Sequence, residues 1–550
     1  MKKKKQTKYI FVVGGVMSGV GKGITSSSIA AVMSARGFST TAIKIDPYIN
    51  VDAGTMNPTE HGEVFVLDDG DECDQDMGNY ERFLDVNLSR LNYMTTGRVY
   101  LEVIGRERNL EYEGKNVEVV PDVPKEVIRR IEKAGKQAGA EVVVVEVGGT
   151  IGEYQNIIFL EAGRMMKTKY PDSVAFVMVS YLPIPSKVGE MKTKPTQYAA
   201  RTLNGVGVQA DIIIARSEVA LDNKRKEKIA TFCNIKKENV ISAPDVDSIY
   251  DVPINFERDK IGEILGQILK LGNHRQTNLT TWKNLARTAK TVSQTVNIAI
   301  VGKYFNSGEF VLSDVYISVI EALKLSAYSL EVKPVLTYIN SQDIENGQYK
   351  LSDLSLFDGV LIPGGFGTTG IEGKIKAIKY VRENKIPYFG LCYGMQLLVI
   401  EYARHLAKIK GATSREIDAK AKNLVIDIMD EQKQNVANKK FGGTMRLGAY
   451  PAKLKVGTLA HSIYGQDQIS ERHRHRYEVN PNFIDKLEQA GLVFSATSPN
   501  GKLMEIAELP QTEHPFFLGT QFHPEFLARP FRPHPLFTAF LTAALKNKKK

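Results

Sequence analysis

The sequence predicts two successive α/β domains, the first of them built on a parallel β-sheet. In both halves of the chain, short apolar runs rich in valine and isoleucine alternate with segments of helical spacing, which is typical of strands joined by crossover helices. A glycine-rich loop follows the first strand, and a Gly-x-Cys-x-Gly turn follows a strand of the second half. The polar stretch 272–296 between the two series holds the only tryptophan, Trp282, and is expected to be a linker.

The expected elements follow this alternation along the chain. Some of the runs, such as EVVVVEV at 141–147, are apolar on both faces, as strands buried inside a parallel sheet are. Helices are expected at 22–36 and at about 394–404, each of them after one of the two turns. We predict strands at 9–15, 40–46, 141–147, 174–180 and 211–216 in the first half, and at 297–302, 358–363, 386–391, 502–508 and 516–522 in the second.

The composition of the 550 residues, 43% hydrophobic and 24% charged, is that of an ordinary globular protein. The net charge of +10 includes two lysine-rich ends, 2–5 and 546–550, which we interpret as solvated tails in preference to nucleic-acid or membrane contacts. The spacing of the three cysteines excludes a CxxC metal site, and their odd number argues against a disulfide framework, which favours a reducing, cytoplasmic setting. Since no apolar stretch reaches the roughly 20 residues of a membrane span, no membrane partner is expected.

A phosphate-binding loop is predicted where the first strand runs into the first helix. The loop reads GGVMSGVGKGIT from position 14, and its glycines allow backbone N–H groups to approach a polyphosphate at a helix N-terminus. Lys22 can reach the outer phosphates. The loop departs from the strict P-loop pattern, because Gly23 stands where a hydroxyl residue normally holds magnesium. Carboxylates elsewhere in the chain are therefore expected to hold the metal.

Two carboxylates are the candidate ligands of that magnesium ion. Glu146 ends the buried strand 141–147, and ligands of open α/β sheets bind at the carboxyl ends of strands. Asp76 closes the acidic stretch 68–76, for which a solvated loop is the commoner explanation. Mg²⁺ is usually held by one or two carboxylates together with phosphate oxygens. A further cluster, KTKPTQ at 192–197, suits a second polyanion, although a basic surface loop explains it at least as well.

The second half carries the elements of a cysteine nucleophile. Cys392 lies in GLCYG, where the glycines permit a sharp turn and the following helix N-terminus favours the thiolate. His523 and Glu525 would point the same way on an extended segment, so that His523 could accept the thiol proton and Glu525 could fix its tautomer. The glycines of PGGFG, at 363–367, free backbone N–H groups to face an oxyanion. Together, in this order, the three motifs are a strong signal of cysteine catalysis.

With these motifs the second half resembles the class I glutamine amidotransferases, and the chain from about 9 to about 540 resembles the CTP synthase family. Its most specific strings are KIDPYINVDAGTMNPTEHGEVFV from 44, GEMKTKPTQ from 189, DVDSIY from 245, GGTMRLG from 442 and ERHRHRYEVN from 471. The resemblance implies a P-loop-type parallel-sheet synthetase domain at 1–271 and a class I glutamine amidotransferase α/β domain at 297–550. It implies that UTP, ATP and glutamine give CTP, ADP, phosphate and glutamate, with ATP phosphorylating the uracil oxygen that ammonia then displaces.

The resemblance also implies roles for residues of the first half. It assigns Mg²⁺ to Asp76 and Glu146. It places Pro58, His61 and Val64 along a passage for ammonia. The residues implied for ATP are Ser18, Gly19, Val20, Gly21, Lys22, Gly23, Ile24, Lys44 and Asp76. The residues implied for UTP, or for CTP as feedback inhibitor, are Ser18, Glu153, Tyr154, Gln155, Lys192, Thr193, Lys194, Pro195, Thr196, Gln197 and Lys228.

In the second half the resemblance implies a catalytic triad of Cys392, His523 and Glu525. The residues implied for glutamine are Gly364, Gly365, Tyr393, Gly394, Met395, Gln396, Glu416 and Arg476. Among them Arg476 suits the α-carboxylate, because its guanidinium can bind a carboxylate through two parallel hydrogen bonds. The family further implies a homotetramer, filaments in some members, and GTP as an activator of the glutaminase.

The chain departs from the family pattern at three places. Members usually read GGTVGDIE, whereas this chain reads GGTIGEYQ from 148, so that Gln155 replaces an acidic residue linked to CTP feedback and weaker inhibition by CTP is expected. Asp122 stands where members usually carry histidine. Thr368 and Thr369 follow PGGFG, where members have an arginine two places on, and this puts GTP activation in question.

Two alternative functions remain open on the sequence. One is another glutamine-dependent amidoligase with a P-loop, which should lack the KTKPTQ string. The other is a filament-forming assembly protein with weak catalysis, against which the intact triad and metal residues count.

Overall fold

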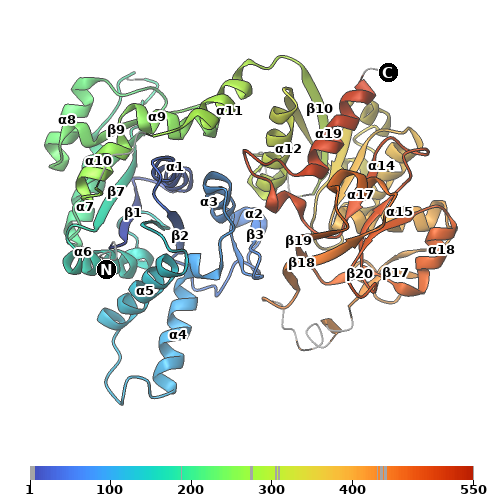
Figure 1. Ribbon diagram of the computed structural model, residues 1–550, viewed down its shortest axis with the longest axis horizontal. Helices are drawn as coiled ribbons and strands as arrows, with labels where there is room; N and C mark the ends of the chain where they lie inside the picture. Colours follow the sequence, from blue (N-terminus) through green and yellow to red (C-terminus); the bar gives the residue numbers. More distant parts are fainter. Residues whose placement is uncertain are drawn as a thin grey trace. The chain divides into compact units, whose positions relative to one another are not determined.

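The computed structural model describes residues 6–187, 189–272, 277–303, 306–307, 310–311, 313–429, 432–433, 438 and 442–548 (Figure 1). The chain divides into two compact units, Met1–Asp52 with Asp76–Arg287 and Ala53–Gln75 with Thr288–Lys550. None of the helices in the described ranges combines the length and the hydropathy of a membrane span. The terminal lysines at 2–5 and 549–550 lie outside the described residues.

The first unit is built on a seven-stranded parallel sheet with the strand order β5-β2-β6-β1-β7-β8-β9. The central strand, β1, pairs with β6 and β7, so the glycine-rich loop that follows β1 emerges at the middle of the carboxyl edge. All five strands predicted for this half are present. The strands are β1 (Lys8–Gly15), β2 (Thr40–Asp46), β5 (Tyr93–Thr95), β6 (Val142–Val147), β7 (Val174–Tyr181), β8 (Ile212–Ser217) and β9 (Val240–Pro244).

Helices link these parallel strands, as crossover connections require. The predicted helix after the glycine-rich loop is α1 (Lys22–Ala35), which is buried over most of its length. The other helices are α3 (Asp76–Leu84), α4 (Thr96–Arg108), α5 (Val119–Gln137), α6 (Ile157–Lys169), α7 (Lys194–Gly205), α8 (Asn223–Cys233), α9 (Val252–Arg258) and α10 (Ile261–Ile268). Short 3₁₀ turns are η1 (Arg90–Asn92), η2 (Tyr154–Asn156), η3 (Lys237–Asn239) and η4 (Ile249–Asp251).

The second unit is built on a nine-stranded sheet with the order β13-β10-β14-β15-β23-β22-β21-β18-β19. The five strands from β13 to β23 are parallel and the remaining ones are antiparallel. All five strands predicted for this half are present. The strands are β10 (Thr295–Gly302), β13 (Lys333–Asn340), β14 (Gly359–Ile362), β15 (Tyr388–Leu391), β18 (Arg446–Leu454), β19 (Gln468–His475), β21 (Val493–Thr497), β22 (Met504–Glu508) and β23 (Phe517–Thr520). Smaller strands are β11 (Asn306–Ser307), β12 (Phe310–Val311), β16 (Thr413–Ser414), β17 (Leu424–Ile428) and β20 (Tyr477–Val479).

Two hydrophobic cores flank this sheet. Alternate residues of β10 belong to different cores, Ala299 and Val301 to one and Ile298 and Ile300 to the other, because side chains alternate across a strand. Helices α14 and α15 contribute to the first core, and α12 and α19 contribute to the second. The helices are α12 (Ile317–Ser329), α13 (Ser341–Glu345), α14 (Ile371–Glu383), α15 (Tyr393–His405), α17 (Leu459–Tyr464), α18 (Ile484–Gln489) and α19 (Pro535–Lys548), with 3₁₀ turns η5 (Ser313–Tyr316), η6 (Leu351–Leu356), η7 (Pro481–Phe483) and η8 (Pro524–Leu527).

The segment Ala53–Gln75, although it comes from the first half of the sequence, packs within the second unit. It forms α2 (Pro58–His61) and an antiparallel hairpin of β3 (Val64–Val66) and β4 (Glu72–Asp74). Two arginines of β19 hold the hairpin: Arg472 forms an ion pair with Asp68, and Arg474 donates from Nε to Oε1 of Glu72 at 2.8 Å. We call this segment the inserted hairpin.

The predicted linker contains a helix. Helix α11 (Thr280–Thr291) carries the buried residues Trp282 and Ala286, and Leu279, just before the helix, is buried as well. The ring of Trp282 packs 4.9 Å from that of Phe83 and 6.3 Å from that of Tyr250, between ring centroids. Three apolar residues in a polar stretch are too weak a pattern to predict this helix from the sequence. Residues 273–276 of the predicted linker lie outside the described part of the chain.

Candidate functional site

The glycine-rich loop between β1 and α1 has the backbone expected of a phosphate cradle. Val16, Gly19 and Gly21 have positive φ angles of 80°, 70° and 88°, a geometry in which neighbouring N–H groups can converge on an anion. Residues 16–19 are exposed, so a ligand can reach them. Lys22, the first residue of α1, donates from Nζ to the carbonyl oxygen of Gly149 at 2.9 Å, and burial lowers its pKa.

Gly23 explains why this loop departs from the usual P-loop pattern. A Cβ atom added at Gly23 would lie 1.9 Å from Oδ1 of Asp76, far inside van der Waals contact. The first residue of α3, Asp76, therefore occupies the space that a hydroxyl side chain would need. The carboxylate of α3 thus lies beside the start of α1, in the place of the missing hydroxyl.

Four charged residues form a cluster at the carboxyl edge of the sheet, with Lys44 at its centre. The Lys44 ammonium forms ion pairs with Asp76, with Glu146 at 3.0 Å, and with Asp46 at 3.7 Å. The hydroxyl of Tyr80 contacts the Glu146 carboxylate. The structure thus brings Lys44, Asp76 and Glu146 together. Asp46 and Tyr80 were missed, although Asp46 ends a predicted strand and could have been found by its position at the same edge.

The carboxylates of this cluster differ in their electrostatics. Burial raises the pKa of both Glu146 and Asp46, whereas the Lys44 ammonium lowers the pKa of Asp76 against the effect of burial. Asp76 and Glu146 converge on one cationic group, which is the arrangement that a shared cation requires. Within the described ranges, no group of three or more His, Cys, Asp or Glu side chains is arranged to hold a metal ion.

The KTKPTQ string begins α7 beside the phosphate loop. The hydroxyl of Ser180 donates to Oγ1 of Thr196 at 2.8 Å, and Ser180 is the strand partner of Gly15. Gln197 donates from Nε2 to Oγ1 of Thr193 at 3.1 Å. Pro195 lies in the first turn, where its missing N–H is tolerated. The helix N-terminus and its polar side chains therefore lie next to the strand that carries the loop.

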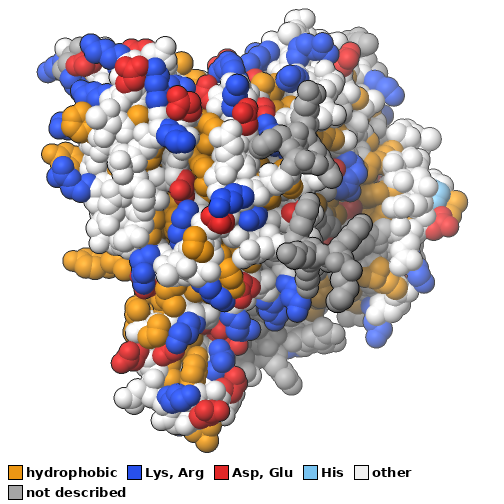
Figure 2. Space-filling model, turned by 60° about the vertical axis from the view of Figure 1, so that its left-hand side comes forward, with side chains coloured by type: hydrophobic (Ala, Val, Ile, Leu, Met, Phe, Trp, Pro, Cys, Tyr) orange, Lys and Arg blue, Asp and Glu red, His pale blue; other side chains and the backbone are white. Residues whose placement is uncertain are grey.

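The three lysines predicted for UTP are accessible. Lys192 forms an ion pair with Glu190 at 2.7 Å, and the ammonium of Lys194 lies 5.6 Å from the ring centroid of Phe232. Lys228 is exposed on α8. On the face shown in Figure 2, lysine and arginine side chains lie among acidic and uncharged ones.

The segment predicted for the pyrimidine of CTP also lies close to the phosphate loop. A Cβ atom at Gly149 would lie 2.8 Å from Oε2 of Glu153, and the Gly149 carbonyl is the acceptor of Lys22. Gln155 donates from Nε2 to Oε2 of Glu153 at 3.2 Å. The side chain of Tyr154 is 92% exposed. The segment presents an open, polar surface.

The second unit carries a strained turn at Cys392. The residue has φ 49° and ψ −96° between β15 and α15, a conformation that a non-glycine residue adopts only when its surroundings impose it. Glycines are required on both sides, because a Cβ atom would lie 2.5 Å from the Tyr388 hydroxyl at Gly390 and 2.4 Å from the Ile362 carbonyl at Gly394. The predicted elbow is therefore present in the structure.

His523 and Glu525 lie beside Cys392, but not on an extended segment as expected. His523 caps η8 and Glu525 lies within this 3₁₀ turn, which still brings Nδ1 of His523 to 2.7 Å from Oε1 of Glu525. Pro524 begins the turn because its fixed φ suits a first helical position. A Cβ atom at Gly364 would lie 2.8 Å from Cε1 of His523 and 3.7 Å from Cβ of Cys392, so this glycine lets the ring and the thiol come together.

The charge on the imidazole is set by its neighbours. Burial opposes protonation, but the charges of Glu525 and Cys392 raise the pKa of His523 to about 10. The Cys392 sulfur also lies 3.6 Å from Nε2 of Gln521 and 3.7 Å from the carbonyl oxygen of Arg474. The arrangement can hold a thiolate beside an imidazolium, which is the state needed for nucleophilic attack followed by protonation of a leaving amine.

The side chains predicted for glutamine gather around the first turn of α15. Glu416 accepts the N–H of Gly367 at 2.6 Å, and the Tyr393 hydroxyl donates to the carbonyl oxygen of Gly367 at 3.0 Å. Gln396 is buried and donates to the carbonyl oxygen of Tyr477 at 3.0 Å. Arg476 donates to Gln432 at 2.8 Å and to Thr444 at 3.0 Å. The members contributed by α15 are Tyr393, Gly394, Met395 and Gln396.

Two lysines near this turn were not predicted. The ammonium groups of Lys303 and Lys374 lie 5.7 Å and 5.6 Å from the ring centroid of Tyr393. Burial lowers the pKa of Lys303 to about 8 and that of Lys374 to about 7. No local pattern marks these lysines, because their position depends on how β10, α14 and α15 pack.

A small cavity of about 70 Å³ lies at Cys392. One wall carries the cysteine, the histidine and the PGGF backbone, and the other walls come from the inserted hairpin and from the region around the start of α12. The lining residues are Pro58, Glu63, Val64, Val315, Tyr316, Val319, Gly364, Gly365, Phe366, Cys392, Arg474, His523, Glu525 and Phe526.

Pro58 and Val64 thus lie at the Cys392 cavity, where the ammonia passage was expected to begin. His61 is exposed and is not among the described residues that line it.

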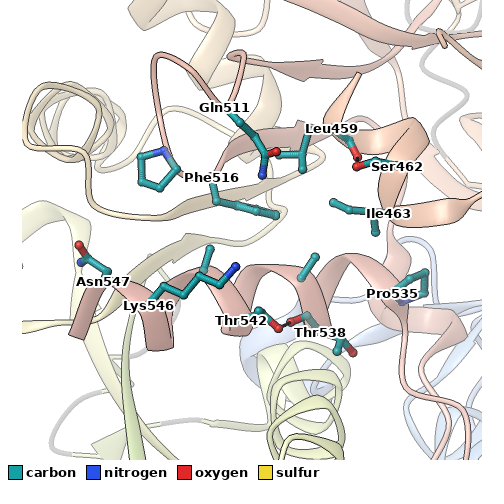
Figure 3. A pocket seen from close by; sticks show the side chains of 13 residues that line it. Leu459, Ser462, Ile463, Gln511, Phe516, Pro535, Thr538, Thr542, Lys546 and Asn547 are labelled. Atoms are coloured by element: carbon teal, nitrogen blue, oxygen red, sulfur yellow. Dashed lines mark hydrogen bonds between the residues drawn. The ribbon is translucent and has the colours of Figure 1, made fainter. Parts of the chain in front are cut away.

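A larger cavity, about 650 Å³, lies between α17 and α19 and away from this chemistry (Figure 3). Leu459 and Ile463 of α17 face Thr538 and Thr542 of α19 across it. Its described lining residues include no cysteine, histidine or carboxylate. Of these two cavities, only the small one is lined by Cys392, His523 and Glu525.

The comparisons with known proteins cover both units. A family model described as "CTP synthase N-terminus" matches residues 8–271, and one described as "Glutamine amidotransferase class-I" matches residues 311–543. The chain is 51% identical to the CTP synthase of Pyrococcus furiosus, over 99% of each chain. It is 46% identical to the CTP synthase of Staphylococcus epidermidis, over 99% of this chain and 100% of the relative. A solved glutaminase domain of Trypanosoma brucei CTPS with bound acivicin is 36% identical, with a TM-score of 0.42, over 46% of this chain and 94% of that one.

Proposed function

This chain belongs to the CTP synthase family, and we propose that its second unit releases ammonia from glutamine at Cys392 while its first unit uses ATP to aminate UTP. The overall reaction converts UTP, ATP and glutamine to CTP, ADP, phosphate and glutamate. The protein is therefore a ligase with a glutaminase attached, and identity along the full length separates it from other P-loop amidoligases.

The single observation that carries the assignment of residues is the strained Cys392 turn beside the His523–Glu525 pair, inside a cavity of about 70 Å³. Packing alone does not require a cysteine in a strained backbone conformation next to an imidazole of raised pKa. Both features are typical of functional sites. The side chains of Pro58 and Val64 line this cavity together with Cys392, which supports an ammonia passage beside the inserted hairpin.

The geometry supports the following course for glutamine hydrolysis. The Cys392 thiolate attacks the carboxamide carbon of glutamine, and backbone N–H groups at Gly365 and in the first turn of α15 stabilise the oxyanion. His523 gives its proton to the leaving nitrogen, so that ammonia departs and a glutamyl thioester remains. His523 then removes a proton from water, whose attack on the thioester yields glutamate and restores the thiol. Glu525 holds the imidazole in the orientation that both steps need.

Glutamine itself is held by the side chains around the first turn of α15. Glu416, Gln396 and Arg476 supply a carboxylate, an amide and a guanidinium for the amino acid's charged and polar ends. Arg476 must exchange its contacts with Gln432 and Thr444 for the α-carboxylate.

In the first unit the phosphate loop, 18–24, and Lys44 hold ATP, and Asp76 and Glu146 hold Mg²⁺. The carboxylates fit that ion: both are hard oxygen donors, and both already converge on one cation, the Lys44 ammonium. Bound Mg²⁺ supplies charge neutralisation on the phosphates during transfer. Lys22 and Lys44 reach the outer phosphates, and the phosphorylated uracil oxygen leaves when ammonia attacks the ring carbon.

The N-terminus of α7 with Lys192, Thr193 and Lys194, together with Lys228, holds the triphosphate of UTP. The segment Glu153, Tyr154 and Gln155 meets the pyrimidine of CTP when CTP acts as feedback inhibitor. We further propose a homotetramer, able to form filaments, and a GTP response of the glutaminase that is weakened because Thr368 and Thr369 replace the usual arginine.

An ultraviolet assay of UTP amination tests the proposal. We expect CTP to form from UTP, ATP and Mg²⁺ with either glutamine or ammonium as nitrogen source, and to require Mg²⁺ with both. GTP is added in a parallel series to measure its effect on the glutamine-dependent rate alone. Absence of CTP formation with both nitrogen sources, in a protein that is folded by circular dichroism, would overturn the proposal.

A further inference from the structure

One contact joins two walls of the Cys392 cavity that come from distant parts of the sequence. Glu63, the residue before β3 in the inserted hairpin, accepts the N–H of Ser318 at 3.2 Å and also the Ser318 hydroxyl. The backbone N–H of Glu63 donates to the carbonyl oxygen of Asp314 at 3.1 Å. Ser318 is the second residue of α12 and is fully buried. We call this set of bonds the hairpin latch.

The residues on both sides of the latch line the cavity. Glu63 and its neighbour Val64 form the hairpin wall, and Val315, Tyr316 and Val319 form the α12 wall on either side of Ser318. The latch therefore fixes the distance between these two walls.

The chemistry of the latch makes it stronger than a neutral contact. A carboxylate that accepts both an N–H and an O–H forms charge-assisted bonds, which are roughly twice as strong as neutral ones. The carboxylate also meets the N-terminus of a helix of thirteen residues, where the helix dipole favours negative charge. Loss of the charge should weaken the latch, and loss of the whole side chain should open it.

We propose that the Glu63–Ser318 latch is a positioning device that keeps ammonia from escaping between the hairpin and α12 after glutamine is cleaved. This inference rests on the proposed function and deepens it. Ammonia that escapes into water is protonated and can no longer attack the activated uracil ring. An open latch would therefore leave glutamine cleavage intact while less of its nitrogen reaches CTP.

The test measures glutamate and CTP in the same reaction mixture, with UTP, ATP, Mg²⁺ and glutamine. We expect about one glutamate for each CTP in the wild type and at least threefold more glutamate per CTP in Glu63→Ala. Ser318→Ala, which removes the hydroxyl and keeps the N–H, should raise the ratio by a smaller factor. The ratio of Glu63→Gln should lie between those of the wild type and Glu63→Ala. The ratio does not depend on how much active protein is present, so a general loss of stability does not change it.

The matched control is Glu60→Ala, which removes an exposed glutamate from α2 of the same hairpin, three residues before Glu63. Its ratio should equal that of the wild type. Added ammonium at saturation should restore the CTP rate of Glu63→Ala to the wild-type ammonium-dependent rate, since this route does not use transferred ammonia.

A ratio near one in both Glu63→Ala and Ser318→Ala would overturn the proposal. If Glu63→Ala does not fold, Ser318→Ala alone decides, because it removes one hydroxyl from the latch. Failure of the proposed function looks different: the wild type would then form no CTP from either nitrogen source.

Discussion

The two candidate sites are prepared for their substrates in different ways. At Cys392 the backbone does the preparation: a strained turn, two obligatory glycines and a bound imidazole–carboxylate pair leave few conformations to choose from. At Lys44 the preparation is electrostatic, with one ammonium surrounded by Asp46, Asp76 and Glu146. We therefore expect the activity of the Cys392 site to depend on single atoms, and that of the Lys44 site to depend on the space and charge available to a nucleotide.

The largest expected effect, which separates the activities of the two sites, comes from removing the sulfur atom of Cys392. Cys392→Ala should lower glutamine-dependent CTP formation by about 10³-fold or more, because no other group in the cavity can form the thioester. Ammonium-dependent formation should survive, since the first unit is untouched. Both rates are measured with the same preparation in the ultraviolet assay. Loss of both activities in a folded protein would contradict the division into two sites.

Gly23→Ser tests the opposite site by restoring the residue type that a standard P-loop carries there. We expect the rate of CTP formation to fall about 100-fold with either glutamine or ammonium. The Cβ atom of the new serine would lie 1.9 Å from Oδ1 of Asp76, so the carboxylate would have to move. Glutamine hydrolysis, measured as glutamate, should remain. Gly105→Ala on α4 is the control, as no atom lies within 4 Å of its added Cβ. A Gly23→Ser protein with normal CTP formation would show that Asp76 does not define this space.

Gln155→Glu examines how far exposed residues tune the nucleotide site. We expect CTP to inhibit this variant about 3–10-fold more strongly than the wild type, because a carboxylate accepts stronger hydrogen bonds than an amide does. The measurement is the CTP concentration that halves the ammonium-dependent rate at fixed UTP. Equal or weaker inhibition in the variant would show that Gln155 does not limit feedback.

The smallest effect concerns the stability contributed by the His523–Glu525 pair. The folded-state pKa of His523 is raised to about 10, above its ordinary value of about 6.5. Its contribution to the free energy of unfolding is therefore complete below about pH 6.5 and is lost as the pH rises through about 10. Glu525→Gln should flatten this dependence, with a thermal midpoint about 2–4 °C lower than that of the wild type at pH 6 and little difference at pH 10. Parallel melting curves at all pH values would contradict the assigned pKa shift.

Local patterns in the sequence predicted five strands of each sheet and the two strand-to-helix turns, but not β5, β9, β13, β18, β19 or β21. Strands such as β6 are visible because burial on both faces leaves an unbroken apolar run, and the turns at Lys22 and Cys392 are visible because only glycine fits their backbones. These features depend on neighbours within a few residues. The pairing of Lys44 with Asp76 could be inferred only through the resemblance to a family.

Other features depend on contacts that no local pattern reveals. The inserted hairpin belongs to the second unit because Arg472 and Arg474, about 400 residues later, pair with its carboxylates. Glu525 reaches His523 through a 3₁₀ turn, although spacing alone suggested an extended segment. The pKa of Lys374 falls to about 7 because of how its helix packs, which a single lysine in a helical pattern does not show.

The inserted hairpin has a consequence for how the protein can be divided. A fragment expressed from Thr288 onward would keep Cys392, His523 and Glu525 but would lose the hairpin wall of the Cys392 cavity. The guanidinium of Arg472, which is fully buried, would also lose the carboxylate of Asp68. Such a fragment would thus be less stable, and its cavity at Cys392 would be open on the side of the missing hairpin, even with Cys392, His523 and Glu525 present. If the gene were cut between the two units, the inserted hairpin would belong to the first fragment. That fragment would have to supply the hairpin to the second fragment to complete the cavity at Cys392.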